Sequence, residues 1–564
     1  MSLTYGEKGS IAYSNERVAD SRVALSYALV RGLSRQTLGD LIGLVLAEQF
    51  TLDESERTQY HSDLFSLAFH TRDILEGKGE RQLFYWFLLK LYDAFPTHVL
   101  RIMELIPFYG SWQDLRQLWE IAREDHKLDI ADRCVELFVK QLRLEHEHLT
   151  NDSHNSNVTL CAKWAPRETG HYHRMAHEIA SQLCPQLIIN RTMQAYRQIL
   201  QRIVRHLDLT ETHMCGGTWA EIQPSRVPGR CLKIHRKALM NQNLKDGTER
   251  STLPDRRICR DHFIEALHKA IVDPSSATIH GAHLYPHELV HEYQKTKHQF
   301  NRNLERSAIL RIADDLVLEA QFLAMVQKYH QLGALGSMVV LADVSGSMYD
   351  QPLEVCVGLA ALISRVNHPV FRNRYMTFSE DPQWHLLDPT WSLGRILQEC
   401  LNDQNWNTTT NFEKAMNLVL QTAIDQRLSP QDMPKYLLVL SDMQFDEAIG
   451  KGLYGNREGS QNHHWEMIQE SYIRHGYNPP TIIYWNLRGD TRNFPATGST
   501  PGVEMVSGFS PALLKLFLEE QPSALSNATT GRAQSDSQVT PYETFRRQID
   551  DSRYDPVRVL LASS

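Results

Sequence analysis

The periodicity of the apolar residues changes near residue 336, and this change divides the chain into two kinds of structure. Before it, apolar residues recur at three- and four-residue steps, the pattern of amphipathic helices. Seven stretches show this pattern: 63–75, 81–95, 98–106, 112–124, 131–149, 191–207 and 306–330. Short polar turns separate them, so we expect an all-α domain over residues 1–335, stacked as an α-solenoid of HEAT type or as a bundle.

After residue 336, short aliphatic and β-branched runs alternate with helical stretches. The runs are 337–344, 435–442, 481–487 and 502–508, and helices are expected over 352–366, 411–427 and 510–520. Strands that are apolar throughout and alternate with helices indicate a mostly parallel sheet covered on both faces. We therefore predict a second domain, 336–520, with a Rossmann-like doubly wound α/β fold.

The end of the chain contains two further segments. Residues 521–539 are rich in Ser, Thr, Ala and Gln, a composition typical of a mobile linker. Thr540, Pro541 and Glu543 then occupy the N-cap, first-turn and capping-box positions of a helix. We expect residues 540–564 to form a helix and tail that pack back on the fold.

The sequence contains no apolar run near the roughly 20 residues that cross a bilayer. Its start also lacks the apolar core of a secretory signal. The eight cysteines are scattered without a Cys-x-x-Cys pair, which is typical of reduced thiols. We therefore expect a protein that makes no membrane contact and is cytoplasmic or nuclear rather than secreted.

A polar loop follows the first predicted strand of the α/β domain. It reads Asp343-Val344-Ser345-Gly346-Ser347 and precedes a helix. Two hydroxyls two residues apart can reach one ion from a tight loop, and the carboxylate adds negative charge. Mg²⁺ prefers such hard oxygen ligands. Open α/β sheets bind ligands at the carboxyl ends of their central strands, so this loop is a candidate metal site.

This Asp-x-Ser-Gly-Ser loop resembles the first loop of the metal-ion-dependent adhesion site in von Willebrand A domains. The resemblance implies two further loops, for which Thr410 and Asp442 are the matching residues. The sequence departs from the family at both places: Asn-Thr-Thr replaces the glycines before Thr410, and Met443 follows Asp442 in place of glycine. Such a site holds Mg²⁺, or another divalent cation such as Mn²⁺ or Ca²⁺. A partner's Asp or Glu completes it, so the resemblance implies binding rather than catalysis.

Phrases along most of the chain together resemble a second family, the domain of unknown function 2828. They are FYGSWQDL (108–115), AKWAPRE (162–168), YPHELV (285–290), VEMVSGFSPALLKLFLE (503–519) and TPYETFRRQIDDSRYDPVRV (540–559). This family joins a helical domain to a von Willebrand A-like domain. The layout is similar to that of the Ro (TROVE) autoantigens, whose helical-repeat ring binds structured RNA beside such a metal domain. This likeness is architectural, and no RNA-contacting residue is carried over from it.

Charge is distributed unevenly along the chain. The net charge is −8, yet residues 191–310 hold 19 Lys and Arg against 12 Asp and Glu, with 10 His. A basic segment in an acidic chain indicates either a phosphate-binding face or an ordinary solvated surface. Aromatic residues are sparse there, which favours recognition of RNA shape or backbone. The candidate RNA contacts are Arg226, Arg230, Lys233, Arg236, Lys237, Arg256, Arg257 and Arg260.

The segment His287-Glu288-Leu289-Val290-His291 matches the His-Glu-x-x-His motif of zinc peptidases. Two histidines four residues apart share a helix face and can hold zinc, with Glu288 as the base. Pro286 places the motif at a helix start, however, and the extended motif fails because Gln294 and Lys297 stand where it needs glycine and a third histidine.

These observations favour a non-enzymatic, Ro-like ribonucleoprotein scaffold that binds structured RNA on its helical domain beside a Mg²⁺-dependent ligand site. The first alternative is a protein-interaction module without an RNA role, in which the metal captures an acidic side chain of a partner. A zinc metallopeptidase is the remaining and least favoured alternative.

Overall fold

The computed structural model describes residues 4–5, 11–12, 20–151, 158–187, 189–243, 248–276, 278–300, 308–333, 335–378, 382–401, 412–443, 462–489, 495–518 and 539–562. The chain forms two compact units. Met1–Thr51 and Gln223–Asp550 form the first, here called the sheet unit, and Leu52–Ile222 and Asp551–Ser564 form the second, the helical unit. None of the helices in these described ranges is long and apolar enough to span a bilayer.

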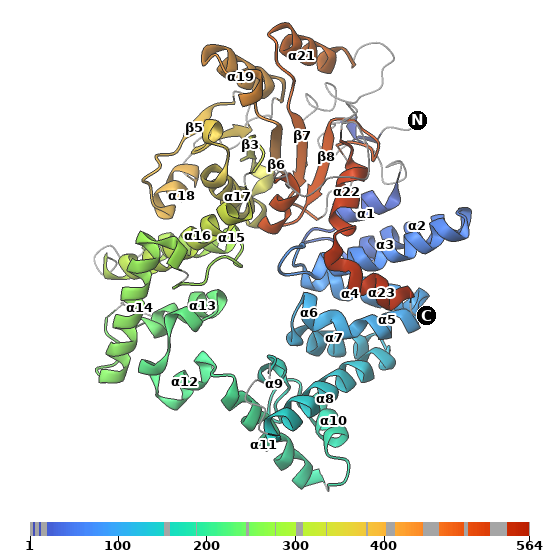
Figure 1. Cartoon of the computed structure of the whole chain (residues 1–564), viewed down its shortest axis with the longest axis vertical. Coiled ribbons are helices and arrows are strands. Elements are labelled where there is room, and N and C mark those ends of the chain that lie inside the picture. Colours follow the sequence, from blue (N-terminus) through green and yellow to red (C-terminus); the bar gives the residue numbers. More distant parts are fainter. Residues whose placement is uncertain are drawn as a thin grey trace, which may run out of the picture. The chain divides into compact units, whose positions relative to one another are not determined.

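A six-stranded sheet forms the centre of the sheet unit (Figure 1). Its order is β5-β4-β3-β6-β7-β8, and every neighbouring pair is parallel except β4 and β5. The four predicted strands are confirmed as β3, β6, β7 and β8, whereas β4 and β5 were not predicted. The bounds are β3 Met338–Asp343, β4 Arg374–Phe378, β5 Trp384–Leu386, β6 Tyr436–Ser441, β7 Thr481–Asn486 and β8 Val503–Ser507. A separate two-stranded ribbon pairs β1 (Thr4–Tyr5) with β2 (Ile11–Ala12).

The strand order makes this a doubly wound sheet, as the sequence predicted. Counted along the chain, the six strands lie in the order 3-2-1-4-5-6, so the winding direction reverses between β3 and β6. Ligands of open α/β sheets bind at such a switch point, outside the carboxyl ends of the two strands. The loops after Asp343 and Ser441 begin side by side at this edge of the sheet.

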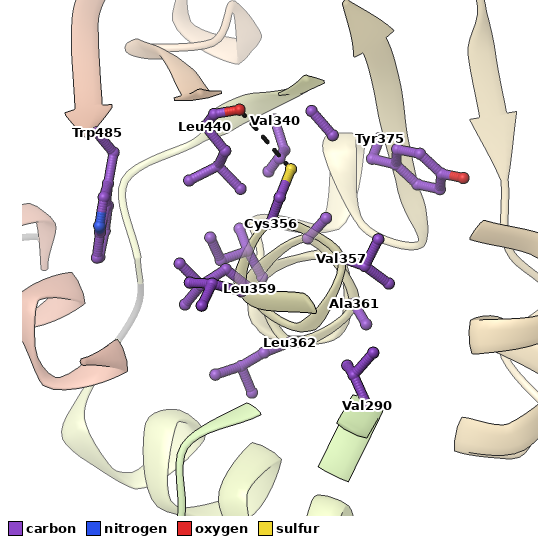
Figure 2. Packing of buried hydrophobic residues seen from close by; sticks show 14 of the residues in the cluster. Val290, Val340, Cys356, Val357, Leu359, Ala361, Leu362, Tyr375, Leu440 and Trp485 are labelled. Carbon is purple, nitrogen blue, oxygen red and sulfur yellow. Dashed lines mark hydrogen bonds between the residues drawn. The ribbon is translucent and has the colours of Figure 1, made fainter. Parts of the chain in front are cut away.

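Helix α17 (Gln351–Val366) is the central helix of the sheet unit, and 13 of its 16 residues are buried. It packs on β3 and β6 and also against α15 (Pro286–Phe300) and α16 (Ala308–Leu332). Figure 2 shows its side chains surrounded by Val290 of α15, Val340 of β3, Leu440 of β6 and Trp485 of β7. Truncating one such buried leucine to alanine typically costs about 2–5 kcal/mol.

The packing of α15 and α16 on α17 explains why the units differ from the predicted division at residue 335. Gly358 of α17 permits the close approach, since a Cβ there would lie 2.8 Å from the backbone carbon of Pro286. Helices α15 and α16, although they precede residue 335, thus belong to the sheet unit. The others in this unit are α1 Ser21–Ala28, α2 Arg35–Glu48, α13 Gly229–Leu239, α14 Pro254–Val272, α18 Leu393–Leu401, α19 Phe412–Asp425, α21 Asn462–Arg474 and α22 Pro541–Ile549.

The segment after β8 corrects one prediction. An α-helix was expected over 510–520, but Pro511–Phe517 forms a 3-10 helix. Ser510 is its N-cap, as predicted, and accepts a hydrogen bond from the Ala512 amide. Leu514 and Phe517 are three residues apart and both buried in the core, and this spacing matches the three residues per turn of a 3-10 helix.

Helix α22 begins with the predicted capping box formed by Thr540 and Glu543. It packs on β8, where Thr544 and Arg547 both contact the buried Glu504 carboxylate. The predicted linker 521–539 falls outside the described residues except at its last position.

The helical unit consists of successive helices that pack on one another, for example α3 on α4, α7 on α8 and α8 on α10. The helical periodicity of the sequence is therefore confirmed. The bounds are α3 Glu54–Arg72, α4 Arg81–Ala94, α5 Pro96–Ile102, α6 Ile106–Tyr109, α7 Trp112–Glu124, α8 Leu128–Thr150, α9 Cys161–Trp164, α10 His173–Leu183, α11 Ile189–His206, α12 Thr210–Gly216 and α23 Asp555–Ala562. The last of these, α23, packs against α3 and α5.

Candidate metal centre

The carboxyl group of Asp343 lies at the end of the central strand β3. All six residues of this strand are buried, and Asp343 itself is 1% exposed. Its Oδ1 accepts a hydrogen bond from the Ser345 amide at 2.9 Å, which folds the following loop back over the strand end. Its Oδ2 accepts a hydrogen bond from the Ser441 hydroxyl at 2.6 Å. The carboxylate is thus fixed in place by groups from two neighbouring strands.

A second carboxylate, Asp442, follows the neighbouring strand β6. The parallel register pairs Ala342 with Leu440, so the residues after each lie side by side at the same edge. Asp442 is completely buried. Met443 follows it with φ of 61°, in the left-handed region that favours glycine. The backbone therefore adopts a glycine-like conformation here although the residue is methionine, and the Met443 amide donates to the Ser441 hydroxyl.

Two hydroxyls from the loop after β3 complete the described part of the centre. Ser345 Oγ and Ser347 Oγ lie 3.0 Å apart, at the start of a short 3-10 turn, Gly346–Met348. The structure therefore gathers four of the five predicted metal-site residues, Asp343, Ser345, Ser347 and Asp442, from the ends of two adjacent strands. The fifth, Thr410, lies outside the described residues.

The two carboxylates affect each other electrostatically. Burial, and after it the neighbouring Asp442 charge, raises the pKa of Asp343 to about 6, against the hydrogen bonds from Ser441 and Ser345 that lower it. Arg488 also lies near this pair, with its Nη1 3.5 Å from Asp442 Oδ2. Arg488 is one-third exposed, so solvent screens part of its charge.

This donor set fits a hard divalent cation. It offers carboxylate and hydroxyl oxygens, which suit Mg²⁺, and contains no thiolate or imidazole ligand, which would suit zinc. A cation between the strand ends would neutralise the repulsion that raises the Asp343 pKa. Of the described residues, none forms a cluster of three or more His, Cys, Asp or Glu side chains able to hold a metal. A metal ion held here would therefore need the serine hydroxyls as ligands in addition to the two carboxylates.

Sequence reasoning missed Ser441 and Arg488. Ser441 ends β6 and holds Asp343 in place, and Arg488 follows β7, the next strand along the sheet. Both could have been found, because residues that follow adjacent parallel strands meet at one edge of the sheet.

Most of the candidate RNA contacts lie in ion pairs within the protein. Glu288 pairs with Arg230 at 2.8 Å and with Lys233 at 3.0 Å. Arg236 pairs with a different carboxylate, Glu292. A third carboxylate, Glu249, forms ion pairs with both Arg257 and Arg260. Arg256 is buried and donates to the Ala238 carbonyl. The two remaining candidates lie nearby in the sequence: Arg226 ends a 3-10 turn, and Lys237 is on α13. These pairings leave less positive charge for a phosphate backbone, and RNA binding stays a prediction.

The residues of the zinc-peptidase motif are also engaged by other groups. Glu288, the residue proposed as base, is held by the two cations just described, and His291 Nδ1 lies 2.7 Å from Glu354. His287 is buried, and burial together with nearby positive charges lowers its pKa to about 3. The motif lies at the first turn of α15, as Pro286 predicted. These contacts do not support a zinc site.

Two family models match this chain. Residues 114–335 match DUF2828, and residues 337–563 match DUF7788, each described as a domain of unknown function. The predicted resemblance to DUF2828 is therefore confirmed for the first of these regions, whereas the phrases after residue 500 fall within the second family instead. An uncharacterized protein of Acanthamoeba polyphaga mimivirus is 27% identical over 467 residues, covering 81% of this chain and 76% of that protein. No solved structure matches the chain.

Proposed function

We propose that the region from residue 337 onward contains a von Willebrand A-type domain that binds a divalent cation, most favourably Mg²⁺, and uses it to capture an acidic group of a protein partner. One observation carries this proposal. Asp343 and Asp442 are buried carboxylates from different loops at the switch point of a doubly wound sheet, where the Asp442 charge acts on Asp343, and the Ser345 and Ser347 hydroxyls follow Asp343 in its loop.

The chemistry of the donor set supports ligand capture rather than catalysis. Two carboxylates and two hydroxyls leave positions of an octahedral Mg²⁺ for water or for an incoming carboxylate. Asp343 and Asp442 would hold such a cation, which would supply positive charge to an acidic group of the partner. Arg488, which follows β7 and lies 3.5 Å from Asp442, would add a second positive charge at the same edge of the sheet.

A metal-binding measurement on the full-length protein tests the proposal. After treatment with chelator and dialysis, Mg²⁺ and Mn²⁺ are titrated by calorimetry, and Mn²⁺ binding is also followed by electron paramagnetic resonance. We expect one site per chain in the wild type. Asp442→Asn and Ser345→Ala should weaken binding at least tenfold, whereas the exposed Asp425→Asn on α19 should bind like the wild type. Equal affinity in all four proteins would show that the metal does not bind here.

The partner part of the proposal needs a separate test. Affinity capture of partners with the wild type and with Ser345→Ala, each in Mg²⁺ and in chelator, should recover proteins that depend on both the metal and the serine. A partner retained equally by the variant in chelator does not use this site.

A further inference from the structure

Arg116 in the helical unit lies between two aromatic rings. It is on α7, and its Cζ is 5.2 Å from the centre of the Trp164 ring and 5.0 Å from that of Tyr172. Both rings attract the positive charge by cation–π contact and hold the guanidinium plane in one orientation. Arg116 is partly buried, and its Nε is shielded from solvent without a hydrogen-bond acceptor. Within the described ranges, its guanidinium forms neither a hydrogen bond nor an ion pair.

Two further arginines act electrostatically on Arg116. Burial lowers the Arg116 pKa most, the Tyr172 hydroxyl opposes this, and Arg167 and Arg81 lower the pKa further. Arg167 follows α9 and donates to the carbonyls of Ala162 and Ala165, which orient its side chain without neutralising it. Arg81 begins α4, and its Nε lies 3.1 Å from Asp114.

Asp114 cannot balance this positive charge by itself. Its Oδ2 already accepts two hydrogen bonds from the buried Arg72, at 3.0 and 2.7 Å, so Arg81 shares a carboxylate that is committed elsewhere. Two acidic side chains on the neighbouring elements, Glu120 and Glu168, are engaged too. Glu120 accepts from Tyr172 and lies against His171, and Glu168 pairs with Arg197. The region around Arg116 therefore carries more positive than negative charge.

We infer that Arg81, Arg116 and Arg167 form an oxyanion site whose ligand is a phosphate group. A guanidinium offers parallel N–H donors that match two oxygens of a phosphate, and an arginine already oriented by packing loses little freedom on binding. Two helices and one turn each supply one arginine, so the ligand would sit near α4, α7 and the turn after α9. An uncompensated, partly buried cation is unfavourable, and a bound anion removes that cost. The inference is independent of the metal centre.

Phosphate binding by the full-length protein tests this inference. Inorganic phosphate is titrated at constant ionic strength against chloride, in chelator, with the melting temperature and ³¹P line broadening as readouts. We expect saturable binding by the wild type and at least tenfold weaker binding by Arg116→Gln and Arg167→Gln. Arg205→Gln, an exposed arginine on α11, is the matched control and should bind like the wild type.

Two further measurements exclude misfolding as the cause of weaker phosphate binding and identify the molecule that carries the phosphate group. Arg116→Lys keeps the charge but loses the planar fork, so it should also weaken phosphate binding while leaving circular dichroism unchanged. The affinities of adenosine 5′-monophosphate, adenosine and phosphate are then compared. If adenosine 5′-monophosphate binds more tightly than phosphate and adenosine does not bind, the natural ligand is a nucleotide. If adenosine 5′-monophosphate and phosphate bind equally, the ligand is free phosphate. Absence of saturable phosphate binding, or wild-type affinity in both glutamine variants, would overturn the inference.

Discussion

Replacing Asp343 with asparagine should stabilise the metal-free protein while it abolishes metal binding. Asp343 is buried beside Asp442, and its pKa rises from the ordinary 3.8 to about 6 in the folded chain. At about 1.4 kcal/mol per pKa unit, holding this carboxyl ionised at neutral pH costs the fold ~3 kcal/mol. The asparagine side chain would keep both hydrogen bonds, because its amide oxygen accepts from the Ser345 amide and its NH₂ group donates to the Ser441 hydroxyl.

The stabilisation by Asp343→Asn should depend on pH. A carboxyl whose pKa is raised on folding stabilises the fold fully below its unfolded pKa of 3.8, and that stability is lost as the pH rises through about 6. Asp343→Asn should therefore exceed the wild type in stability by up to ~3 kcal/mol at pH 7.5 and by little at pH 4.

Hydrogen exchange followed by mass spectrometry, with the full-length protein in chelator, measures the effect locally. Peptides from β3 and β6 should exchange up to about 100-fold more slowly in Asp343→Asn at pH 7.5, since each 1.4 kcal/mol corresponds to tenfold. Added Mg²⁺ should slow exchange in the wild type and leave the variant unchanged. Faster exchange in the variant at pH 7.5 in chelator would refute the reasoning, because it would mean that the ionised carboxylate stabilises the metal-free fold.

Three further substitutions test the packing around the two sites. Asp114→Asn should destabilise the helical unit by about 3–5 kcal/mol, because it leaves buried arginine without its carboxylate, and exchange in α3 and α7 should report the loss. Gly358→Ala should lower the melting temperature, because the new Cβ meets the α15 backbone, whereas Gly39→Ala has open space and should be neutral or stabilising. Arg547→Met should destabilise α22 more at pH 7.5 than at pH 4, because burial already raises the Glu504 pKa and removing the cation raises it further. A loss that does not grow with pH would contradict that account.

The strands of the fold were predictable from the sequence where their residues form continuous apolar runs. Strands β3, β6, β7 and β8 are fully or almost fully buried, so their apolar runs stand out in the sequence. Strand β4 begins with arginine, and β5 has three residues whose side chains are partly or largely exposed. Strand β5 therefore carries no apolar run, because its three side chains are not fully covered by other elements. The division of the chain was harder to predict, because it depends on which helix face packs on α17, and periodicity alone does not identify that partner.

The candidate site was predictable to the extent that its residues follow strands. Asp343 and Asp442 end apolar runs, so parallel pairing alone brings them to one edge of the sheet. The pairing of the basic residues was not predictable, because it depends on which residues meet in space. Arg230 and its partner Glu288 are 58 residues apart. A charge count over 191–310 registers both residues but cannot reveal that they neutralise each other.

Most buried charges discussed above are paired with an opposite charge, but the two proposed sites are not balanced in this way. The first has an excess of negative charge and the second an excess of positive charge. Elsewhere in the described ranges, buried carboxylates such as Asp73 with Arg553 and Glu504 with Arg547 are each paired with an arginine. At the ends of β3 and β6, two buried carboxylates lie close enough that the Asp442 charge adds to burial in raising the Asp343 pKa. Around Arg116, arginines gather against one carboxylate that another arginine already holds. Folding alone gives no reason to keep an unbalanced charge in a partly desolvated place, because each imbalance lowers stability. A cation bound at the first place and an anion at the second would remove both costs, and such departures from local pairing are where binding sites are expected.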